Sequence, residues 1–417
     1  MTAGHAPAAG GRRRAARWLL AAAAATSAIL LVEFGLRNVG GVFHDTFMMP
    51  DYYRGWVLKP GFSGWISDEN TLWVTINSDG LRDREHPLEV PPDTVRIAVL
   101  GDSYMQGINV PREATFPTFL EDAVARCLTG TGRVAETLNF GVSGYGTAQE
   151  LLTFRHHAAK YRPNVVLLSV YTGNDVFNNR RDLNPQSYSE QSPYFTLRDG
   201  RLELNTTFRE VLAADAAQPQ WRQLRIRITD RYRTAQLVHQ FYGWLRPYVV
   251  DAKDADAEQD ESSNGRFDHV DDEIYRPSLV PEVVDAWQVT EALLVALARE
   301  VQEAGAEFWI VTLANAAQLE PDLAARAGHQ KSLGVDSLYY PDRRIRALAE
   351  RHGIPVITLA ERLADLVATK GGVLNGGYND RYPLGSGHWN EVGNRTAAEM
   401  TGEQLCAGSS AIARLRE

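Results

Sequence analysis

The sequence contains little cysteine and no excess of basic residues. Its 417 residues include two cysteines, too few for a cysteine-rich zinc module or for a scaffold held by several disulfides. Lys and Arg number 43 against 52 for Asp and Glu, and the net charge is −9, whereas a broad nucleic-acid interface needs a basic face. Hydrophobic residues form 44% and charged residues 23% of the chain, a composition that argues against a disordered or a polytopic membrane protein.

Familiar catalytic and cofactor motifs are also absent. The sequence has no Gly-x-Ser-x-Gly elbow, no Walker loop, no His-Glu-x-x-His helix and no Cys-x-x-Cys pair. The acidic tract Asp251–Glu261 lacks the glycine and the spaced ligands of a calcium loop, so we interpret it as a solvated linker. The sequence therefore implies no cofactor and no metal.

One long apolar run is present, and it lies close to the N-terminus. Trp18 to Val32 carries no charge, and four arginines precede it within residues 12–17. A basic flank followed by an apolar stretch orients a helix with its arginines in the cytoplasm. Counted from Ala15, the stretch is just long enough to cross about 30 Å of hydrocarbon. We predict a single-pass anchor within residues 1–37, with secretion after signal cleavage as the alternative.

Two further segments differ in pattern from the main body of the chain. Residues 38–92 contain short β-prone runs on either side of the turn Ser67-Asp68-Glu69-Asn70, which predicts a small β-containing lead-in. Residues 178–281 contain the hairpin signal Asp199-Gly200 and an amphipathic helical stretch over 221–246. We interpret 178–281 as an insertion of mixed structure that acts as a lid or a partner surface.

The remaining residues, 93–177 and 282–417, alternate between short apolar runs and longer amphipathic stretches. The predicted strands are Val95–Leu100, Glu136–Phe140, Asn164–Tyr171, Glu307–Leu313 and Pro355–Leu359, and the predicted helices span 116–128, 148–160, 282–304, 342–352 and 391–406. This alternation predicts an α/β domain with a doubly wound, flavodoxin-like parallel sheet between two helical layers.

The loops that follow the predicted strands carry residues suited to acyl transfer, and such loops meet at one edge of a parallel sheet. Ser103, in Gly101-Asp102-Ser103, follows the first strand and can act as a nucleophile. The second strand is followed by Gly141-Val142-Ser143-Gly144-Tyr145-Gly146, whose three glycines leave backbone N–H groups unobstructed, and the third is followed by Asn174. Backbone N–H groups and a side-chain amide can therefore hold an oxyanion. His388, just before the last helix, can serve as the general base.

The order Gly-Asp-Ser, glycine-rich loop, Gly-Asn-Asp and late His resembles the SGNH or GDSL hydrolases, a superfamily of serine esterases and acyl-transfer enzymes. With Asn77-Ser78-Asp79-Gly80-Leu81-Arg82-Asp83 upstream, the chain is similar to a bacterial, membrane-anchored branch often associated with cell-surface polysaccharides. The resemblance implies Ser103 as nucleophile, His388 as base, and an oxyanion hole made by the Ser103 N–H, Gly144 and Asn174. It also implies an inner-membrane protein with a periplasmic catalytic domain.

The chain departs from that family pattern at one position. Most members have an Asp three residues before the His, and this sequence has Gly385 there. Asp380 and Glu391 are nearby candidates for a substitute that orients the histidine, and a backbone carbonyl or no orienter at all are the other options. Asp102 and Asp175 adjoin tight turns, and we assign them to loop structure.

The expected function is an extracytoplasmic serine esterase that removes acetyl or other short acyl groups from carbohydrate. An O-acetyltransferase of cell-surface polysaccharide would use the same residues, and a non-catalytic carbohydrate-binding protein on the same fold is a third alternative. The expected partners are an acylated carbohydrate or another ester and, through the N-terminal helix, the membrane. Trp56, Trp65, Trp73 and Trp389 could stack on sugar rings, although the first three suit buried packing better.

The two cysteines occupy matching positions in the predicted fold. In a sheet wound this way, the helix after the first strand and the last helix lie on the same face. Cys127 and Cys406 are each at the far end of one of these helices, and an exported location permits a disulfide between them. We therefore treat Cys127–Cys406 as a candidate disulfide.

Overall fold

The computed structural model describes residues 9–38, 46–184, 189–249, 270–371 and 373–414. They belong to two units: a smaller unit of Met1–Asp45 with Gln218–Ser263, and a larger unit of Thr46–Ala217 with Asn264–Glu417. The described part of the lead-in therefore belongs to the same unit as the main α/β body. The acidic tract predicted to be a linker, 251–261, lies outside the described residues.

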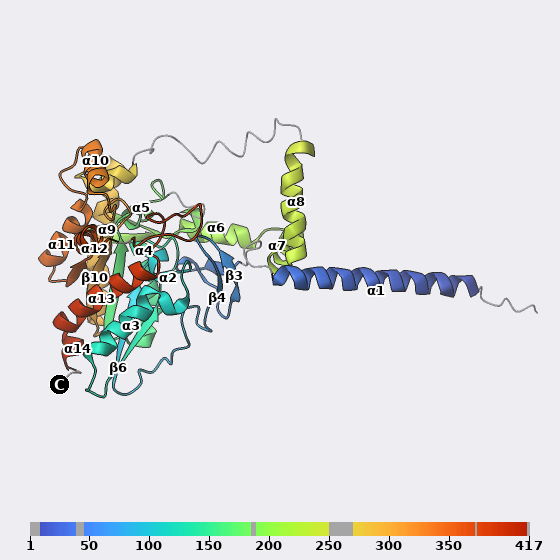
Figure 1. Cartoon of the computed structure of the whole chain (residues 1–417), viewed down its shortest axis with the longest axis horizontal. Coiled ribbons are helices and arrows are strands. Elements are labelled where there is room, and N and C mark those ends of the chain that lie inside the picture. The colour runs from blue at the N-terminus through green and yellow to red at the C-terminus, as the bar shows by residue number, and fades with distance from the viewer. Residues whose placement is uncertain (1–8, 39–45, 185–188, 250–269, 372, 415–417) are drawn as a thin grey trace, which may run out of the picture. The chain divides into compact units, whose positions relative to one another are not determined.

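A five-stranded parallel sheet forms the centre of the larger unit (Figure 1). Its order is β11–β10–β7–β5–β6, with β5 at Thr94–Leu100, β6 at Val134–Asn139, β7 at Val165–Tyr171, β10 at Glu307–Leu313 and β11 at Val356–Thr358. Numbered along the chain, this is the flavodoxin-like order 2-1-3-4-5, which confirms the predicted doubly wound fold. Because β6, β5 and β7 are neighbours in a parallel sheet, the loops that follow them begin side by side at its carboxyl edge.

Helices cover both faces of the sheet because its strands bury side chains on both sides. In β5, Ala98 and Leu100 belong to one hydrophobic cluster, whereas Ile97 and Val99 belong to another. The first cluster includes residues of α4 (Thr147–His156), α9 (Pro281–Glu303) and α11 (Tyr340–Arg351), and the second includes residues of α3 (Phe116–Cys127), α12 (Ala360–Lys370) and α13 (Glu391–Gly408). The three predicted layers are thus present. The sequence prediction lacks α12 and α10 (Leu323–Leu333).

Shorter helices complete the larger unit. They are α2 (Ser103–Gln106), α5 (Asp175–Asn178), α6 (Thr207–Ala216) and α14 (Ser410–Arg414), with short 3-10 turns at Arg112–Ala114, Ala158–Tyr161, Ser189–Gln191 and Val270–Tyr275. The first two follow β5 and β7 directly, so each begins at the carboxyl edge of the sheet.

The lead-in consists of two antiparallel hairpins. They are β1 (Met48–Asp51) with β2 (Gly55–Leu58), and β3 (Ser63–Ser67) with β4 (Thr71–Thr75). Their inward side chains, among them Trp56, Leu58, Ile66 and Val74, form one buried cluster with Ile108, Val142 and Tyr145. Because these last three residues follow β5 and β6, the hairpins lie against the loops at the carboxyl edge of the sheet.

The described residues of the segment predicted as an insertion, 178–281, belong to both units. Its hairpin, β8 (Tyr194–Arg198) with β9 (Arg201–Asn205), turns at Asp199 and Gly200, both with positive φ, and belongs to the larger unit. The helix predicted over 221–246 is instead two helices of the smaller unit, α7 (Gln220–Arg231) and α8 (Arg233–Val249). They break at the extended residue Tyr232, because the backbone N–H groups that begin α8 donate to the carboxylate of Glu33.

A disulfide joins Cys127 at the end of α3 to Cys406 near the end of α13, with the two Cα atoms 6.3 Å apart. The two helices pack closely along their length. A Cβ on Gly402 of α13 would come within 2.5 Å of the Cβ of Ala123 of α3, so only glycine permits this approach. The bond connects residues 279 positions apart.

We expect Cys127→Ser/Cys406→Ser to lower the free energy of unfolding by about 2–4 kcal/mol, because the cross-link restricts the unfolded chain. Guanidinium denaturation of the purified protein, followed by tryptophan fluorescence, measures the change. Reductant should destabilise the parent chain to the same extent and leave the double variant unaffected. Equal midpoints for oxidised parent and variant would contradict the prediction.

Candidate active site

Ser103 is the first residue of α2, directly after the buried strand β5. The side chain of Asp102 caps this short helix by accepting a hydrogen bond from the Tyr104 N–H at 2.9 Å. The preceding residue, Gly101, lies so close to its neighbours that a Cβ would stand 2.4 Å from Ser169 Oγ. The tight turn therefore places the Ser103 hydroxyl at the carboxyl edge of the sheet.

His388 meets this hydroxyl from the far end of the chain. Its Nε2 lies 2.7 Å from Ser103 Oγ. The ring centroid of Tyr104 is 4.7 Å from that of His388 and 5.2 Å from that of Trp389. The backbone directly after the histidine is also fixed, since Asn109 Nδ2 donates to Trp389 O at 2.8 Å. The imidazole is thus held in hydrogen-bonding reach of the serine.

The carboxylate beside His388 is Glu69, from the turn between β3 and β4. Its Oε1 lies 2.7 Å from His388 Nδ1, and both of its oxygens accept from the His388 backbone N–H, at 3.0 and 2.9 Å. Glu69 is 3% exposed, and its carbonyl accepts from Asn379 Nδ2 at 2.6 Å. A serine, an imidazole and a carboxylate therefore form a continuous chain of hydrogen bonds.

Our candidates for the orienting acid, Asp380 and Glu391, are wrong. Both are exposed, whereas the histidine nitrogen that needs a partner is occupied by Glu69. Glu69 and His388 are 319 positions apart, and they meet because the lead-in hairpins pack on the carboxyl edge of the sheet. The turn was visible in the sequence, but no fixed spacing relates it to the histidine.

The charges around His388 favour its protonated form. Burial alone would lower the pKa of His388, but the hydrogen bond and the negative charge of Glu69, with a smaller effect of the Asp102 charge, raise it above its ordinary value. This arrangement suits a general base, because it stabilises the imidazolium that forms when the serine loses its proton.

Gly144 and Asn174 lie in the loops after β6 and β7, the strands on either side of β5. Gly144 has a φ of +78°, a conformation that favours glycine. Its loop is held by Gln106, whose Oε1 accepts from the Ser143 N–H at 2.6 Å. Among the described residues, no backbone carbonyl accepts from the N–H of Ser103 or of Gly144. Both donors are thus unused by the fold, and their role as an oxyanion hole stays a prediction.

No family model matches this chain, and no curated protein matches it. Solved structures do. An acetyl xylan esterase, AlAXEase, is 13% identical, with 75% of this chain and 100% of that chain covered and a TM-score of 0.36. A G-D-S-L family lipolytic protein from Desulfitobacterium hafniense is 11% identical over 74% and 98%, with a TM-score of 0.35. A catalytic mutant of an acetylxylan esterase from Geobacillus stearothermophilus is 9% identical over 76% and 95%, with a TM-score of 0.35.

Three carboxyl groups are buried beneath the loops of the site: Asp102, Glu150 and Asp175. Burial raises the pKa of all three, and their mutual repulsion raises those of Glu150 and Asp175 further. Asp175 Oδ2 accepts from the Tyr171 N–H at 2.7 Å, while both oxygens of Glu150 are buried without a hydrogen-bond partner. Asp175 thus contacts the backbone of its own loop, whereas Asp102 accepts both from the Tyr104 N–H and, at 3.4 Å, from the Ser103 hydroxyl.

The four tryptophans that could stack on sugars differ in exposure. Trp56 and Trp389 are buried, at 4% and 1% exposed, so neither presents a ring to a ligand. Trp73 is 55% exposed, so its predicted burial is wrong. It pairs across the β3–β4 hairpin with the half-buried Trp65, edge to face, with ring centroids 5.6 Å apart. These two rings lie on the outer face of the hairpin whose turn carries Glu69.

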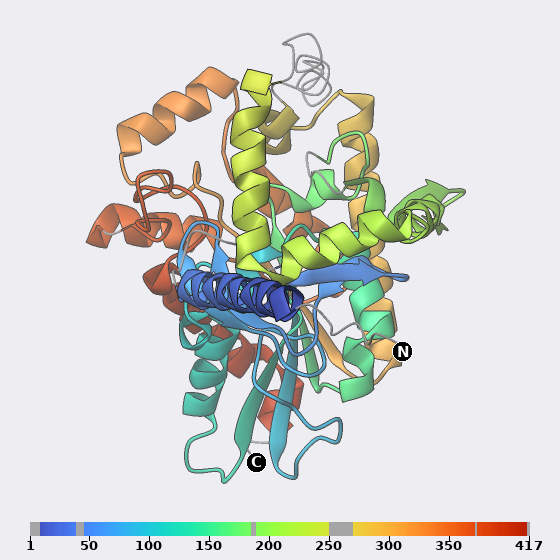
Figure 2. The same ribbon diagram turned by 90° about the vertical axis from the view of Figure 1, so that its right-hand side faces the viewer.

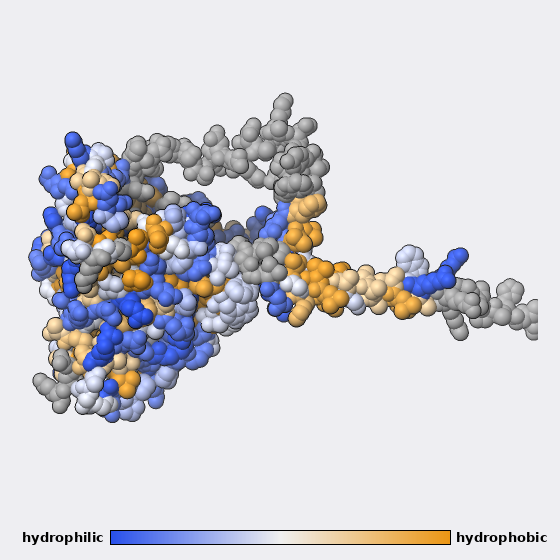
Figure 3. All heavy atoms as spheres, in the orientation of Figure 1, coloured by the Kyte–Doolittle hydropathy of each residue, from blue (hydrophilic) through white to orange (hydrophobic). Residues whose placement is uncertain are grey.

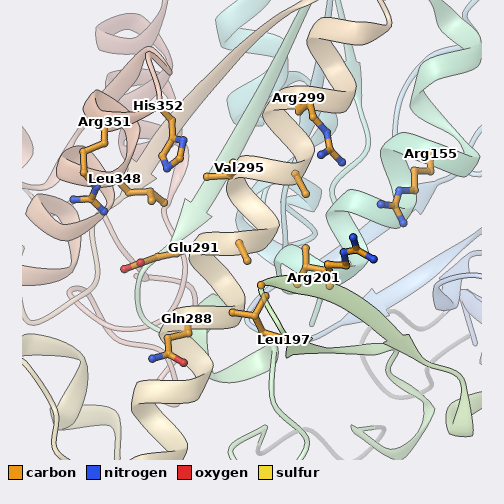
Figure 4. A pocket seen from close by; sticks show the side chains of 14 residues that line it. Arg155, Leu197, Arg201, Gln288, Glu291, Val295, Arg299, Leu348, Arg351 and His352 are labelled. Carbon is orange, nitrogen blue, oxygen red and sulfur yellow. The ribbon is translucent and has the colours of Figure 1, made fainter.

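A cavity of about 670 Å³ lies elsewhere, between the β8–β9 hairpin and helices α9 and α11 (Figure 4). Arg155, Arg201 and Arg299 line it together with Glu291. Its lining includes none of Ser103, Gly144, Asn174 and His388. Among the described residues, no cluster of His, Cys, Asp and Glu is arranged to hold a metal ion.

We expect Gly387→Ala to displace Glu69 and to lower kcat about 10²-fold, the cost of a misplaced catalytic group. A Cβ on Gly387 would stand 2.5 Å from Glu69 Oε1. Gly385→Ala is the matched control, because Gly385 also has positive φ but its Cβ would have no neighbour closer than 3.9 Å. Steady-state hydrolysis of p-nitrophenyl acetate measures both variants. Equal losses would mean that backbone strain, not contact with Glu69, is responsible.

Proposed function

We propose that this chain is a serine esterase of the SGNH or GDSL type. The observation that carries the proposal is the hydrogen-bonded chain from Ser103 Oγ through His388 to Glu69, with 2.7 Å at each step. The flavodoxin-like sheet supports it by bringing the loops of Gly144 and Asn174 to either side of the serine. In this proposal, Glu69 supplies the carboxylate that most members of the family have at the position occupied here by Gly385.

In the proposed reaction, Ser103 Oγ attacks the ester carbonyl while its proton moves to His388 Nε2. Glu69 accepts the hydrogen bond from Nδ1 and stabilises the imidazolium. The N–H groups of Ser103 and Gly144 and the amide of Asn174 receive the negative charge on the carbonyl oxygen, each donor contributing about 3–4 kcal/mol in comparable sites. His388 then protonates the leaving alcohol. Water, activated by the same imidazole, releases the acid from the acyl-enzyme.

The proposed substrates are short acyl esters, above all acetyl esters, of carbohydrate outside the cytoplasm. Trp73, exposed beside the half-buried Trp65, supports a sugar as the alcohol component, since an exposed indole ring presents a flat apolar face to a sugar ring. They belong to the hairpin that carries Glu69. Transfer of the acyl group to a sugar hydroxyl would require the same residues, and only the acceptor would differ.

The proposed location depends on α1 (Ala9–Arg37), whose segment Ala16–Arg37 is long and apolar enough to span a membrane. Its side chains are almost wholly exposed, with Trp18 at 76%. Such a surface is stable in hydrocarbon and costly in water. With the arginines of residues 12–17 on the cytoplasmic side, the chain after α1 is extracytoplasmic.

Labelling with a fluorophosphonate, followed by peptide mass spectrometry, tests the nucleophile. The adduct should fall on Ser103 and be absent from His388→Ala, in which the serine is not activated. Incubation with p-nitrophenyl acetate, with or without oligosaccharide, distinguishes release of acetate from transfer to sugar. Modification of another serine, or none, together with no turnover of any acetyl ester, would refute the proposal and favour a non-catalytic carbohydrate-binding protein.

A further inference from the structure

The smaller unit presents an unusual amount of apolar surface outside α1. In α8, the side chains of Leu237, Val238, Phe241 and Tyr242 are exposed, and those of Val238 and Tyr242 reach 68% and 62%. Positions four apart share a helix face, so these residues form one stripe, which we call the apolar face of α8. Gln236, His239 and Gln240 form the opposite, polar face. Figure 3 shows the apolar surface of α8 continuing into that of α1.

The adjoining helix α7 also has an exposed apolar stripe, which is shorter than that of α8. Trp221, Leu224 and Ile228 lie on one face and are exposed, Trp221 at 65%. Arg225 and Arg231 flank this stripe. An apolar stripe with a tryptophan and flanking arginines is typical of helices that lie in a membrane interface, where long cationic side chains reach the headgroups.

A buried carboxylate fixes the start of α8 to the end of α1. Glu33, the acidic residue at the end of the apolar run, is 7% exposed. Its Oε1 accepts from the Arg233 N–H at 3.0 Å, and its Oε2 accepts from the N–H and the hydroxyl of Thr234 at 2.9 and 3.0 Å. Arg37, one turn later in α1, pairs with Glu33 at 2.9 Å and donates to Arg231 O. These bonds satisfy the free N–H groups at the start of a helix.

The length of α1 and the direction of α8 determine where the apolar face of α8 lies relative to the bilayer. The 22 residues of Ala16–Arg37 rise about 33 Å as a helix, enough to cross the hydrocarbon, so Glu33 and Arg37 lie at the level of the headgroups. From that level α8 runs crosswise to α1 (Figures 1 and 2). If α1 crosses the bilayer, α8 lies parallel to the membrane plane at its surface.

We propose that α7 and α8 form a membrane-surface element that inserts the apolar face of α8 into the outer leaflet of the bilayer that α1 crosses. This rests on the proposed membrane anchoring of the chain. The occupant of the apolar face is lipid, because the face begins at headgroup level and adjoins a helix that itself requires lipid. The arginines of α7 favour anionic headgroups. A single transmembrane helix is a flexible tether. A helix pair bound to the surface restricts the directions in which the rest of the chain can extend from the bilayer.

Fluorescence quenching in full-length protein reconstituted in lipid vesicles tests whether the apolar face of α8 contacts lipid. A single cysteine at Tyr242→Cys on the apolar face, or at Gln240→Cys on the polar face, carries an environment-sensitive fluorophore, while Cys127 and Cys406 remain in their disulfide. Brominated phosphatidylcholine should quench the fluorophore at 242 several-fold more than at 240, and iodide in the buffer should do the reverse. Adding phosphatidylglycerol should increase the bromolipid quenching at 242.

Two other quenching results would overturn the proposal. Equal quenching at both sites would mean that α8 does not lie on lipid. Protection of 242 from both quenchers, with energy transfer between labelled copies that rises with protein-to-lipid ratio, would mean that the apolar face binds a second copy. Hydrolysis of p-nitrophenyl acetate by the same vesicles should be equal for both labelled variants. Its absence would count against the esterase and leave the location of α8 to the quenching result.

Discussion

Ser103→Ala should lower kcat for ester hydrolysis about 10⁶-fold, the loss that follows removal of a serine nucleophile from a working triad. The variant keeps the 2.9 Å bond between the Asp102 side chain and the Tyr104 N–H, so α2 and the fold should persist. Hydrolysis of p-nitrophenyl acetate, measured beside the thermal unfolding midpoint, separates loss of chemistry from loss of structure.

Ser386→Ala is the control for this experiment. Ser386 is two residues from His388, yet its hydroxyl donates to Pro383 O at 2.9 Å and takes no part in the hydrogen-bonded chain. Its activity should stay close to that of the parent protein. If Ser103→Ala retained comparable activity while folded, the nucleophile would be another group and the proposed mechanism would fail.

Glu69→Gln should lower kcat about 10⁴-fold, as expected when the carboxylate of a triad is replaced by its amide. Glutamine keeps the size of the side chain but removes the charge that stabilises the imidazolium. It can also present an N–H to His388 Nδ1 and so favour the wrong tautomer. Glu391→Gln is the matched control, because Glu391 is exposed and contributes no hydrogen bond to the histidine in the described structure.

The pH profile of kcat/KM shows whether Glu69 acts through the histidine. In the parent protein, activity should rise with pH through a midpoint above about 6.5, because the pKa of His388 is raised and only neutral imidazole can accept the serine proton. Removing the negative charge of Glu69 should move this midpoint to lower pH. A large loss with an unchanged midpoint, or an equal loss in Glu391→Gln, would show that Glu69 does not orient the base.

Ser103, Gly144 and Asn174 were predictable because they are tied to strands. Each follows a short apolar run that alternates with helices, and a parallel sheet brings the ends of its strands to one edge whatever the rest of the chain does. His388 was predictable for a related reason, since it directly precedes the last helix, α13. Local patterns and the winding rule are sufficient to bring these four residues into one region.

Glu69 and the break at Tyr232 were not predictable in the same way. Glu69 reaches His388 because the apolar side of the β3–β4 hairpin, including Ile66 and Val74, packs with Ile108, Val142 and Tyr145 after β5 and β6. The apolar period over 221–246 continues through Tyr232 without interruption, and the chain breaks there because Glu33 supplies acceptors for a new helix start. In both cases the deciding partner is remote in sequence and has no characteristic spacing.

The amino-acid sequence by itself determined the α/β class, the winding of the sheet, the apolar helix at the N-terminus and the loops that carry a serine, an asparagine and a histidine. These depend on periodicity and on short-range turn chemistry, which act within one or two elements. Tertiary structure alone decided which carboxylate faces the imidazole, which tryptophans remain exposed and where α7 and α8 belong. Those outcomes depend on packing between surfaces far apart in the chain, and packing is set by shape and burial that no local pattern encodes.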